Sequence, residues 1–424
     1  MKYLIIGNST AGLAAVEAIR ESDRKGTITV VSDERHQPYS RPLITYWLAG
    51  KADDRKMHYK GKDYMKKKRV NLVLGKRAVR LDTRQKTVTL DDGKMLEYDR
   101  LLIATGGTPI NPQLKGSNLK GVYNLTTWDD AKKVGEYVRE NLVKHATVIG
   151  GGLIGLKATE ALAELGLKVT VLELSDRILA STLDRKASEM MIDYLRKKGI
   201  DVMTGNTAEE ILGGEMVEGV KLKDGRTIKT QMVIVAIGVR PNTSLAGGTP
   251  IKVNRGILVD GNMQTNVKGV YAAGDAAEAM DTLMEAPRTI AIWPLAVRQG
   301  RVAGQNMAGR KTEYGGGFPM NSVEICGMPT ISAGITDPKE KGYELLEQQK
   351  AGEGSYRKVV LKDGRLVGMI LLGDVERAGI FTGLIEGKVD VSAVKEHLLH
   401  DDFGLIMLPK GYKKHLVTGP GMEV

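Results

Sequence analysis

Two glycine-rich turns carry the clearest chemical signal in this chain of 424 residues. In GGGLIG, Gly150, Gly152 and Gly155 have GxGxxG spacing and directly follow the apolar run TVI. Glycines at these positions let the backbone approach a pyrophosphate, which then lies at the positive end of the following helix. Glu173 closes the next apolar strand, where a carboxylate accepts hydrogen bonds from a ribose diol. Because a carboxylate there would repel a 2′-phosphate, the turn predicts a site for NADH rather than NADPH.

The first turn, GNSTAG, follows the apolar run YLII and keeps only part of the same pattern. Gly7 and Gly12 occupy glycine positions, whereas Ser9 replaces the second glycine. Serine is small enough to allow a slightly looser approach of a dinucleotide. Asp33, after the next strand, is expected to supply the acid for the ribose, with Glu34 as the alternative.

Each turn needs a strand before it and a helix and a second strand after it. The segments LAAVEAIRES and TITVVSD follow the first turn, and LKATEALAELG and KVTVLE follow the second. The stretches 88–106 and 220–238 also align without gaps, each as a hairpin that turns at Asp-Gly and then an apolar strand that ends in glycine. The sequence therefore predicts an α/β protein with two Rossmann-like dinucleotide-binding domains on a shared plan.

The pattern changes after residue 242. Residues 266–279 are predicted to form a strand, a turn and a helix, and residues 293–309 a further helix. The segment EYGGGFP at 313–319 has the composition of a linker. Beyond it, residues 356–374 predict a hairpin followed by helical segments, and this last part carries no motif of its own.

Composition narrows the function classes. Hydrophobic residues at 42% and charged residues at 27% are ordinary for a soluble globular protein, and no apolar run approaches the roughly 18 residues of a membrane span. A strand begins almost at the first residue, so we expect no signal peptide and a cytoplasmic location. The single cysteine, Cys326, excludes an internal disulfide, and no Cys/His cluster has zinc or iron–sulfur spacing, so no metal site is expected.

The net charge of +11 concerns partners and solubility rather than fold. Residues 56–77 hold nine Lys or Arg residues and one acid, Asp63. Such a run is either a solvated helix face or a surface that meets an acidic protein, a nucleic acid or an anionic membrane.

Five motifs in a fixed order resemble one family. They are GNSTAG near the N-terminus, LLIATGG at 101–107, GGGLIG at 150–155, VAIGVRPN at 235–242 and VYAAGDAAE at 270–278. Together they resemble the pyridine nucleotide–disulfide oxidoreductases. PYSRP and WPLAVRQGRVAGQNMAG are similar to the branch with rubredoxin reductases and the flavoprotein part of NADH-dependent nitrite reductases. The resemblance covers about residues 1–310. It implies an FAD-binding domain at 1–112 and 243–314, an NAD-binding domain at 113–242 and a smaller α+β C-terminal interface domain at 315–424.

The resemblance also implies roles for single residues. One FAD would lie on Gly7, Ser9, Ala11, Gly12 and Asp33, with its ribityl chain on Asp275. Ala104, Thr105 and Gly106 would line the segment in which the chain returns beside the FAD. The helix after Asp275 would point its N-terminus at the cofactor, although an ordinary helix cap is the alternative role for this residue. Arg41, Pro42 and Trp293 would lie near the flavin, and Trp293 could equally be a core residue. One NAD(H) would lie on Gly150, Gly152, Leu153, Ile154, Gly155, Glu173 and Gly238.

The departures from the family pattern are informative. The disulfide- and peroxide-reducing branches have a cysteine near the position of Pro42, and this chain has none there, so we expect no thiol intermediate. The putidaredoxin-reductase-like branch pairs a lysine with a glutamate at positions that correspond to Thr45 and Lys157 here. The positive charge is therefore expected on the other side of the pair. Leu153 stands where some relatives have a gating tyrosine.

Lys157 is the one residue for which we predict a catalytic role. If it lies close to the isoalloxazine, it favours the reduced, anionic flavin by about 4 kcal/mol at an effective dielectric constant near 20. That energy corresponds to about 90 mV for a two-electron couple. The alternative is a solvated lysine at the edge of a buried stripe formed by Ile154, Ala158, Ala161 and Leu165.

These features together predict an FAD-containing NADH oxidoreductase. Electrons would pass between NAD(H) and a small acidic iron–sulfur protein of the rubredoxin or ferredoxin type, which the basic residues 56–77 would steer. An NADH oxidase that reduces oxygen to hydrogen peroxide is the first alternative. The second is a flavin-loaded protein that binds nucleic acid, which aromatic residues at only 5% of the chain disfavour. The sequence is compatible with a homodimer and with a subunit of a larger redox complex.

Overall fold

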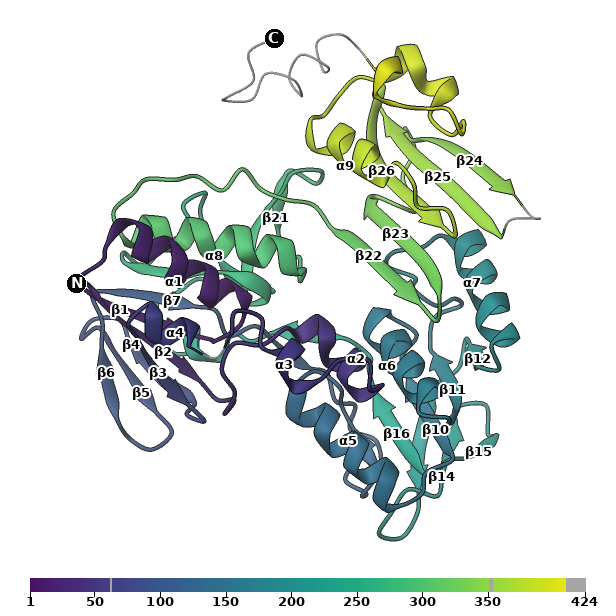
Figure 1. The fold of residues 1–424 in the computed structure, drawn as a ribbon, viewed down its shortest axis with the longest axis horizontal. Coiled ribbons are helices and arrows are strands. Elements are labelled where there is room, and N and C mark those ends of the chain that lie inside the picture. The colour runs from purple at the N-terminus through teal and green to yellow at the C-terminus, as the bar shows by residue number, and fades with distance from the viewer. Residues whose placement is uncertain (62, 351–353, 409–424) are drawn as a thin grey trace. The chain divides into compact units, whose positions relative to one another are not determined.

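The computed structural model describes residues 1–61, 63–350 and 354–408 (Figure 1). The chain forms two compact units. The first contains Met1–Gln113, Tyr123–Leu142 and Ala236–Phe318, and the second contains Leu114–Val122, Val143–Val235 and the chain from Pro319 onward. Among the described residues, no helix has the length and apolar character needed to cross a membrane.

The first unit is built on a five-stranded parallel sheet. Its order is β19 (Val270–Ala272), β7 (Arg100–Ile103), β1 (Lys2–Ile6), β2 (Thr27–Ser32) and β3 (Val70–Leu74). The inner strands are continuous apolar runs because both faces of the sheet are covered. The predicted strand, helix and strand after the first glycine turn are confirmed as β1, α1 (Thr10–Ser22) and β2.

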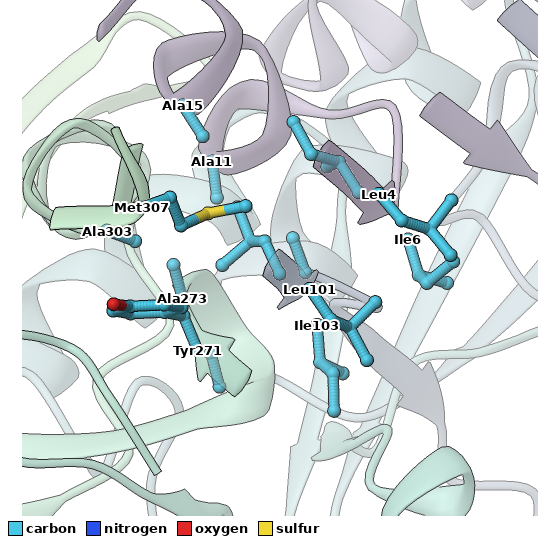
Figure 2. Close-up of a cluster of buried hydrophobic side chains, with 14 of the residues drawn as sticks. Leu4, Ile6, Ala11, Ala15, Leu101, Ile103, Tyr271, Ala273, Ala303 and Met307 are labelled. Atoms are coloured by element: carbon cyan, nitrogen blue, oxygen red, sulfur yellow. The ribbon is translucent and has the colours of Figure 1, made fainter. Parts of the chain in front are cut away.

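Two helices, α1 and α8 (Trp293–Met307), pack against each other on this sheet. Figure 2 shows small side chains of these helices, among them Ala11, Ala15 and Ala303, in one apolar cluster with Leu4 and Leu101 of the strands. The two helix backbones come so close that a Cβ atom on Gly300 would lie 2.1 Å from the Ala11 carbonyl oxygen. The predicted helix at 293–309 is therefore confirmed, and its glycines have a packing reason.

The second unit repeats this arrangement. Its parallel sheet has the order β12 (Asp201–Thr204), β11 (Lys168–Glu173), β10 (His145–Ile149), β16 (Met232–Val235) and β9 (Val122–Tyr123). The helices α6 (Leu153–Glu164) and α7 (Arg185–Lys197) pack on its strands. The second predicted βαβ unit is thus confirmed as β10, α6 and β11.

The internal repeat is confirmed strand by strand. Residues 88–106 lie on β5 (Thr87–Leu90), β6 (Met95–Glu97) and β7, and residues 220–238 lie on β14 (Gly219–Leu222), β15 (Thr227–Lys229) and β16. Both turn glycines have positive φ, 82° at Gly93 and 87° at Gly225. Each hairpin pairs with a preceding strand, β4 (Ala78–Asp82) or β13 (Ala208–Leu212), that carries a bulge at the matching place.

The C-terminal part of the second unit is an antiparallel sheet. Its order is β22 (Met320–Ile325), β23 (Met328–Gly334), β26 (Arg365–Leu372), β25 (Ser355–Lys362) and β24 (Glu344–Lys350), with α9 (Ala378–Glu386) packed on β26. The hairpin predicted at 356–374 is confirmed as β25 and β26. No helix or strand includes the predicted linker at 313–319, which leads into this sheet.

A buried polar cluster joins the C-terminal sheet to α7. The Asp184 carboxylate caps α7 by accepting from the Ala187 amide at 2.9 Å. It also accepts from the Tyr356 hydroxyl at 2.7 Å and from Lys358 Nζ at 2.8 Å, both on β25. Apolar residues of α7 and of the sheet surround the cluster, which therefore couples the two parts of this unit.

One predicted element is wrong. The helix expected directly after Asp275 is instead the short turn Gly274–Ala276 followed by β20 (Ala277–Asp281). This strand pairs with β18 (Ile257–Leu258) and β21 (Ala286–Arg288), and the buried Glu278 carboxylate accepts from the Gly256 amide at 2.8 Å. Alanine favours helices, but strand pairing and this buried hydrogen bond outweigh that weak preference.

Candidate functional site

The first glycine turn forms a tight passage between β1 and α1. A Cβ atom on Gly7 would lie 2.0 Å from the Ala104 carbonyl oxygen, and one on Gly12 would lie 2.1 Å from the Gly7 carbonyl oxygen. Gly7 also has a φ of 121°, so glycine is required at both positions. Ser9 is the N-cap of α1, and its side chain makes no capping hydrogen bond.

The same turn has the features of an anion site. The first hydrogen bond of α1 runs from the Leu13 amide to the Ser9 carbonyl, so the preceding amides point beyond the helix end. The first turn of α1 holds no acidic residue that would repel an anion. These features fit a pyrophosphate at the helix N-terminus.

Two acids follow β2, and their surroundings differ. The Asp33 side chain is 58% exposed, and its nearest cation is Arg77 Nε at 3.8 Å. The Glu34 side chain is only 18% exposed, accepts from the Tyr39 hydroxyl at 2.6 Å and contacts the Arg41 guanidinium. Asp33 stays the sequence prediction for the ribose, but the enclosed position of Glu34 favours the alternative.

The segment that follows β7 packs against the segment that follows β16. Ala104 continues β7 and donates to the Ile6 carbonyl at 2.8 Å, and the Thr105 hydroxyl donates to the Asn242 carbonyl at 2.6 Å. Gly106 and Gly238 both have positive φ and precede β8 (Gly107–Pro109) and β17 (Val239–Pro241), which pair antiparallel. The structure thus brings together the two segments that follow the repeated strands, around Gly106 and Gly238.

The segment 35–50 docks on the start of α5 (Trp128–Glu140). Arg41 begins a short 3-10 turn, Arg41–Leu43, and donates from Nη1 to the Thr126 carbonyl at 2.8 Å. The Trp128 amide donates to the Tyr39 hydroxyl at 3.2 Å, and the His36 ring lies 2.7 Å from the Asp129 carboxylate. Pro42 is exposed, and α2 (Ile44–Leu48) packs on α5.

Sequence reasoning missed the residues of α5 that hold this segment. The signal was present, because Thr127 and Asp130 form a capping box in which each side chain accepts from the backbone amide of the other. A capping box marks where a helix begins, but it does not reveal which loop packs beside it.

Asp275 lies in the turn after β19. Burial raises the pKa of its carboxyl, and the nearby Arg41 charge opposes that rise. A desolvated carboxyl that needs a hydrogen-bond partner fits a hydroxyl of the ribityl chain. The helix that approaches this turn is α8, whose Gln299 side chain accepts from the Gly274 amide at 2.9 Å. Trp293 begins α8, is only half-buried, and packs edge-on against Tyr59 with ring centroids 5.6 Å apart.

The second glycine turn fits a second dinucleotide. Gly150 has a φ of 114° and donates to the Leu172 carbonyl at 2.7 Å, and Gly152 is the N-cap of α6, whose first turn carries no acid. Glu173 accepts at 2.7 Å from the Gly151 amide, which fixes its carboxylate beside the turn. Gly155 is buried, Leu153 is half-buried and Ile154 is 38% exposed.

The stripe proposed for α6 is partly wrong. Ala158 and Ala161 are buried as expected, but Ile154 and Leu165 are 38% and 39% exposed. Both lie at the ends of the helix, beyond the sheet that covers its middle turns.

Lys157 is enclosed rather than solvated. Its side chain is 14% exposed, pairs with the Glu160 carboxylate one turn later, and donates to the Glu324 carbonyl of β22 at 3.1 Å. The solvated alternative is therefore wrong. Because the pair carries no net charge, the 90 mV expected of an isolated lysine is an upper limit.

Cys326 lies far along the chain from either glycine turn, in the tight turn between β22 and β23. Its φ is 52°, and its carbonyl accepts from the Tyr194 hydroxyl at 2.9 Å. Burial raises the pKa of the thiol to about 11. The thiol is therefore protonated at neutral pH and a poor nucleophile.

The basic residues of 56–77 differ in their surroundings, and some of them are paired with acids. Lys60, after α3 (Asp54–Met57), pairs with Glu17 at 3.1 Å, and Lys76 pairs with Asp92 at 2.9 Å. Lys66, on α4 (Tyr64–Lys67), and Arg69 are exposed. Lys62 lies outside the described residues.

Comparison with known proteins agrees with this geometry. The chain is 32% identical to the NADH-dependent phenylglyoxylate dehydrogenase subunit epsilon of Aromatoleum evansii, over 94% of each chain. It is also 32% identical to the nitrite reductase [NAD(P)H] of Bacillus subtilis over 92% of its own length, but spans only 48% of that protein. The crystal structure of NADH:rubredoxin oxidoreductase from Clostridium acetobutylicum matches with a TM-score of 0.78 and 26% identity, over 93% of this chain and 97% of that one. Other relatives are named NADH oxidase and persulfide reductase.

Two family matches cover most of the chain. Residues 319–389 match the rubredoxin NAD+ reductase C-terminal domain, and residues 1–300 match the pyridine nucleotide-disulphide oxidoreductases. Members of the second family use FAD and NAD(P)H, for which both glycine turns are suited. The chain therefore belongs to the pyridine nucleotide-disulphide oxidoreductase family and is an FAD-dependent NAD(P)H oxidoreductase.

Proposed function

We propose that this protein passes electrons from NADH, through FAD, to a small acidic iron–sulfur protein of the rubredoxin or ferredoxin type, without a cysteine relay. The observation that supports this proposal most directly is the environment of Cys326, the only cysteine in the sequence. Its raised pKa of about 11 and its position between β22 and β23 are unsuited to a relay. The match of residues 319–389 to the rubredoxin NAD+ reductase C-terminal domain supports the acceptor class.

The residues of the first unit would hold and orient FAD. The amides at the start of α1 would bind its pyrophosphate, and Gly7 and Gly12 allow the tight backbone turn that presents these amides. Glu34 or Asp33 would bind the adenosine ribose, and Asp275 would accept from a ribityl hydroxyl. When bound, FAD supplies the conversion of a two-electron hydride donor into single electrons for an iron–sulfur acceptor.

The residues of the second unit would hold NADH. The amides at the start of α6 would bind its pyrophosphate, and Glu173 would accept from the ribose diol. The Gly151 and Ser175 amides each donate to one carboxylate oxygen of Glu173 at 2.7 Å, which orients the group, and each oxygen keeps a lone pair for a ribose hydroxyl. A 2′-phosphate beside this acid would be repelled, which supports NADH as the donor.

The acceptor would dock near Tyr59 and Trp293. Tyr59 is 41% exposed and covers the edge of Trp293, which the family resemblance places by the flavin. The exposed Lys56 supplies positive charge close by in sequence, whereas Lys60, 5.1 Å from the centre of the Tyr59 ring, is already paired with Glu17. Positive charge beside an exposed aromatic pair suits the approach of an acidic protein, and it raises the association rate more than the final affinity.

An anaerobic experiment tests the proposal. The FAD-loaded protein is reduced with one equivalent of NADH and mixed with rubredoxin, with ferredoxin or with oxygenated buffer in a stopped-flow instrument. Fast flavin reoxidation by an iron–sulfur protein, slowed by salt, is expected. A Cys326→Ser variant should react at the same rate. Reoxidation by oxygen alone would favour the NADH oxidase alternative, and loss of activity in Cys326→Ser would refute the thiol-free route.

A further inference from the structure

A cavity in the first unit lies apart from both glycine turns. It is formed mainly at the amino ends of β2 and β3, next to the C-terminal end of α1 and to α4. Its volume of about 590 Å³ is in the range of small-molecule sites. None of the residues predicted for FAD or NADH lines it. Gly7 follows the carboxyl end of β1, whereas Thr27 and Val70 are the first residues of their strands, so the two sites belong to opposite edges of one parallel sheet.

The lining of this cavity, which we call the basic cavity, is strongly positive. It contains five cationic residues and one acidic residue: Arg20, Arg24, Lys25, Lys66, Arg69 and Asp63. Within the described residues, no ion pair to an acid is found for Arg24, Lys25, Lys66 or Arg69. Like charges that gather around a hollow without acidic partners raise the local concentration of anions.

The acids of the neighbouring helix are occupied elsewhere. The Glu17 carboxylate accepts from the Tyr64 hydroxyl and pairs with Lys60. Glu21 forms a two-pronged pair with Arg301, with distances of 2.8 and 3.0 Å. Asp23 accepts from the Lys25 and Gly26 amides and from the Tyr3 hydroxyl. The hydrogen bonds from the Gly26 and Lys25 amides lower the pKa of Asp23 and fix it inside its own turn.

The cavity is also organised by the backbone. The Arg20 guanidinium donates to four carbonyl oxygens, those of Lys68, Asp23, Gly26 and Arg69, at 2.7 to 3.0 Å. It therefore ties the turn before β2 to the turn before β3. Arg69 has a φ of 51°, an uncommon conformation for a non-glycine residue, and Arg20 holds its carbonyl in place. A strained residue that is fixed by its surroundings is often part of a binding site.

We propose that the basic cavity binds a phosphate-bearing anion of nucleotide size, in addition to FAD and NADH. Arg24 and Arg69 offer planar guanidinium groups that match phosphate oxygens in pairs, and Lys25 and Lys66 add point charges. Ile28, Met65 and Leu72 give the cavity an apolar wall for the rest of the ligand. An acidic protein is a poorer fit, because a concave site of this volume encloses a small ligand better than a protein surface.

Isothermal titration of the full-length, FAD-loaded protein tests this proposal. Saturating NAD+ fills the dinucleotide site, and the probes are inorganic triphosphate and ATP. We expect one site per chain for both probes, with an affinity that falls as salt is added. Tighter binding of ATP would identify a nucleotide as the ligand, and equal binding would identify the phosphates alone.

Matched variants locate the binding. The Arg24→Glu/Lys66→Glu double variant should weaken both probes at least about tenfold, because two attractive charges become repulsive. Arg84→Glu/Lys94→Glu makes the same charge change at exposed positions outside the cavity and should leave the affinity within about twofold. Arg24→Lys/Lys66→Arg should retain it. All four positions are exposed, so the fold is not at risk, and thermal unfolding of each variant checks this.

Three results would overturn the proposal. They are the absence of saturable binding by either probe, an equal loss in the control variant, and a loss of iron–sulfur protein reoxidation in Arg24→Glu/Lys66→Glu while neither probe binds. The last result would make the cavity a docking surface for the acceptor. Because the titration needs no catalysis, failure here is distinct from failure of the proposed electron transfer.

Discussion

Removing the charge of Asp184 should destabilise the second unit severely. The Lys358 side chain is 3% exposed and that of Asp184 is 8% exposed, so their 2.8 Å ion pair is almost free of water. Asp184→Asn keeps the shape and a helix-capping side chain but leaves the Lys358 charge buried with one remaining acid, Glu347 at 3.6 Å. Breaking a buried pair in this way costs about 3–5 kcal/mol, and Glu347 should bring the cost toward the lower end.

The double variant Asp184→Asn/Lys358→Met completes a cycle. If the cost comes from an uncompensated charge, removing the lysine as well should recover about 2 kcal/mol relative to the sum of the single changes. Native-state hydrogen exchange on peptides from α7 and β25 measures the free energy of opening of this unit. All three tryptophans, Trp47, Trp128 and Trp293, lie in the first unit, so tryptophan fluorescence gives an internal control that should not change.

The pH dependence has a definite sign. Burial alone would raise the pKa of Asp184, but hydrogen bonds from Lys358, the Ala187 amide and Tyr356 outweigh it and lower the pKa. A lowered folded-state pKa adds stability that is complete above the unfolded value of about 3.9 and is lost as pH falls through the folded value. Additive single and double variants, or a cost below about 1 kcal/mol for Asp184→Asn, would refute the reasoning.

Three further outcomes are expected. Glu34→Gln should weaken FAD retention in gel filtration about tenfold or more, while Asp33→Asn changes it less than about threefold, because only Glu34 is enclosed beside Arg41. The reverse ranking would restore Asp33 as the ribose acid. Lys157→Glu changes the charge beside Glu160 by two units and should shift the flavin potential negatively, by at most about 180 mV, in spectroelectrochemical titration. A potential that does not move in the negative direction would refute the electrostatic role. Cys326 in the folded protein should react slowly with iodoacetamide at pH 7 and faster only as pH nears the thiol pKa of about 11. Rapid labelling at neutral pH would contradict its burial.

Much of the fold can be predicted from the sequence because local conformational preferences agree with the tertiary structure. Gly7 is recognisable since no other residue tolerates both its positive φ and its close neighbours, and Gly150 since its φ of 114° disfavours any side chain. The duplicated hairpins are recognisable since Asp-Gly turns and apolar strands recur at one spacing. In these places a short window of residues contains the whole physical cause.

The sequence is least informative where the physical cause is distant along the chain. The strand at 277–281 reads as a helix until β18 and β21 pair with it. Glu34 is enclosed because Tyr39 and Arg41 contact it, whereas Asp33 is exposed. The spacing of residues along the sequence does not predict these contacts. The solvated alternative for Lys157 fails because β22 supplies a carbonyl from 167 residues away. Each case depends on a partner in another element.

The close packing of α1 against α8 has a consequence for how the chain folds during synthesis. About 280 residues separate the start of α1 from the start of α8, and ribosomes add about 5–20 residues per second. The alanine face of α1 and one edge of its sheet therefore wait roughly 15–60 s for their partners α8 and β19. During this interval an apolar surface is exposed on the nascent chain, so the first unit should depend on chaperones, and substitutions at Gly300 or Gly304 should show first as aggregation of newly made protein rather than as loss of activity.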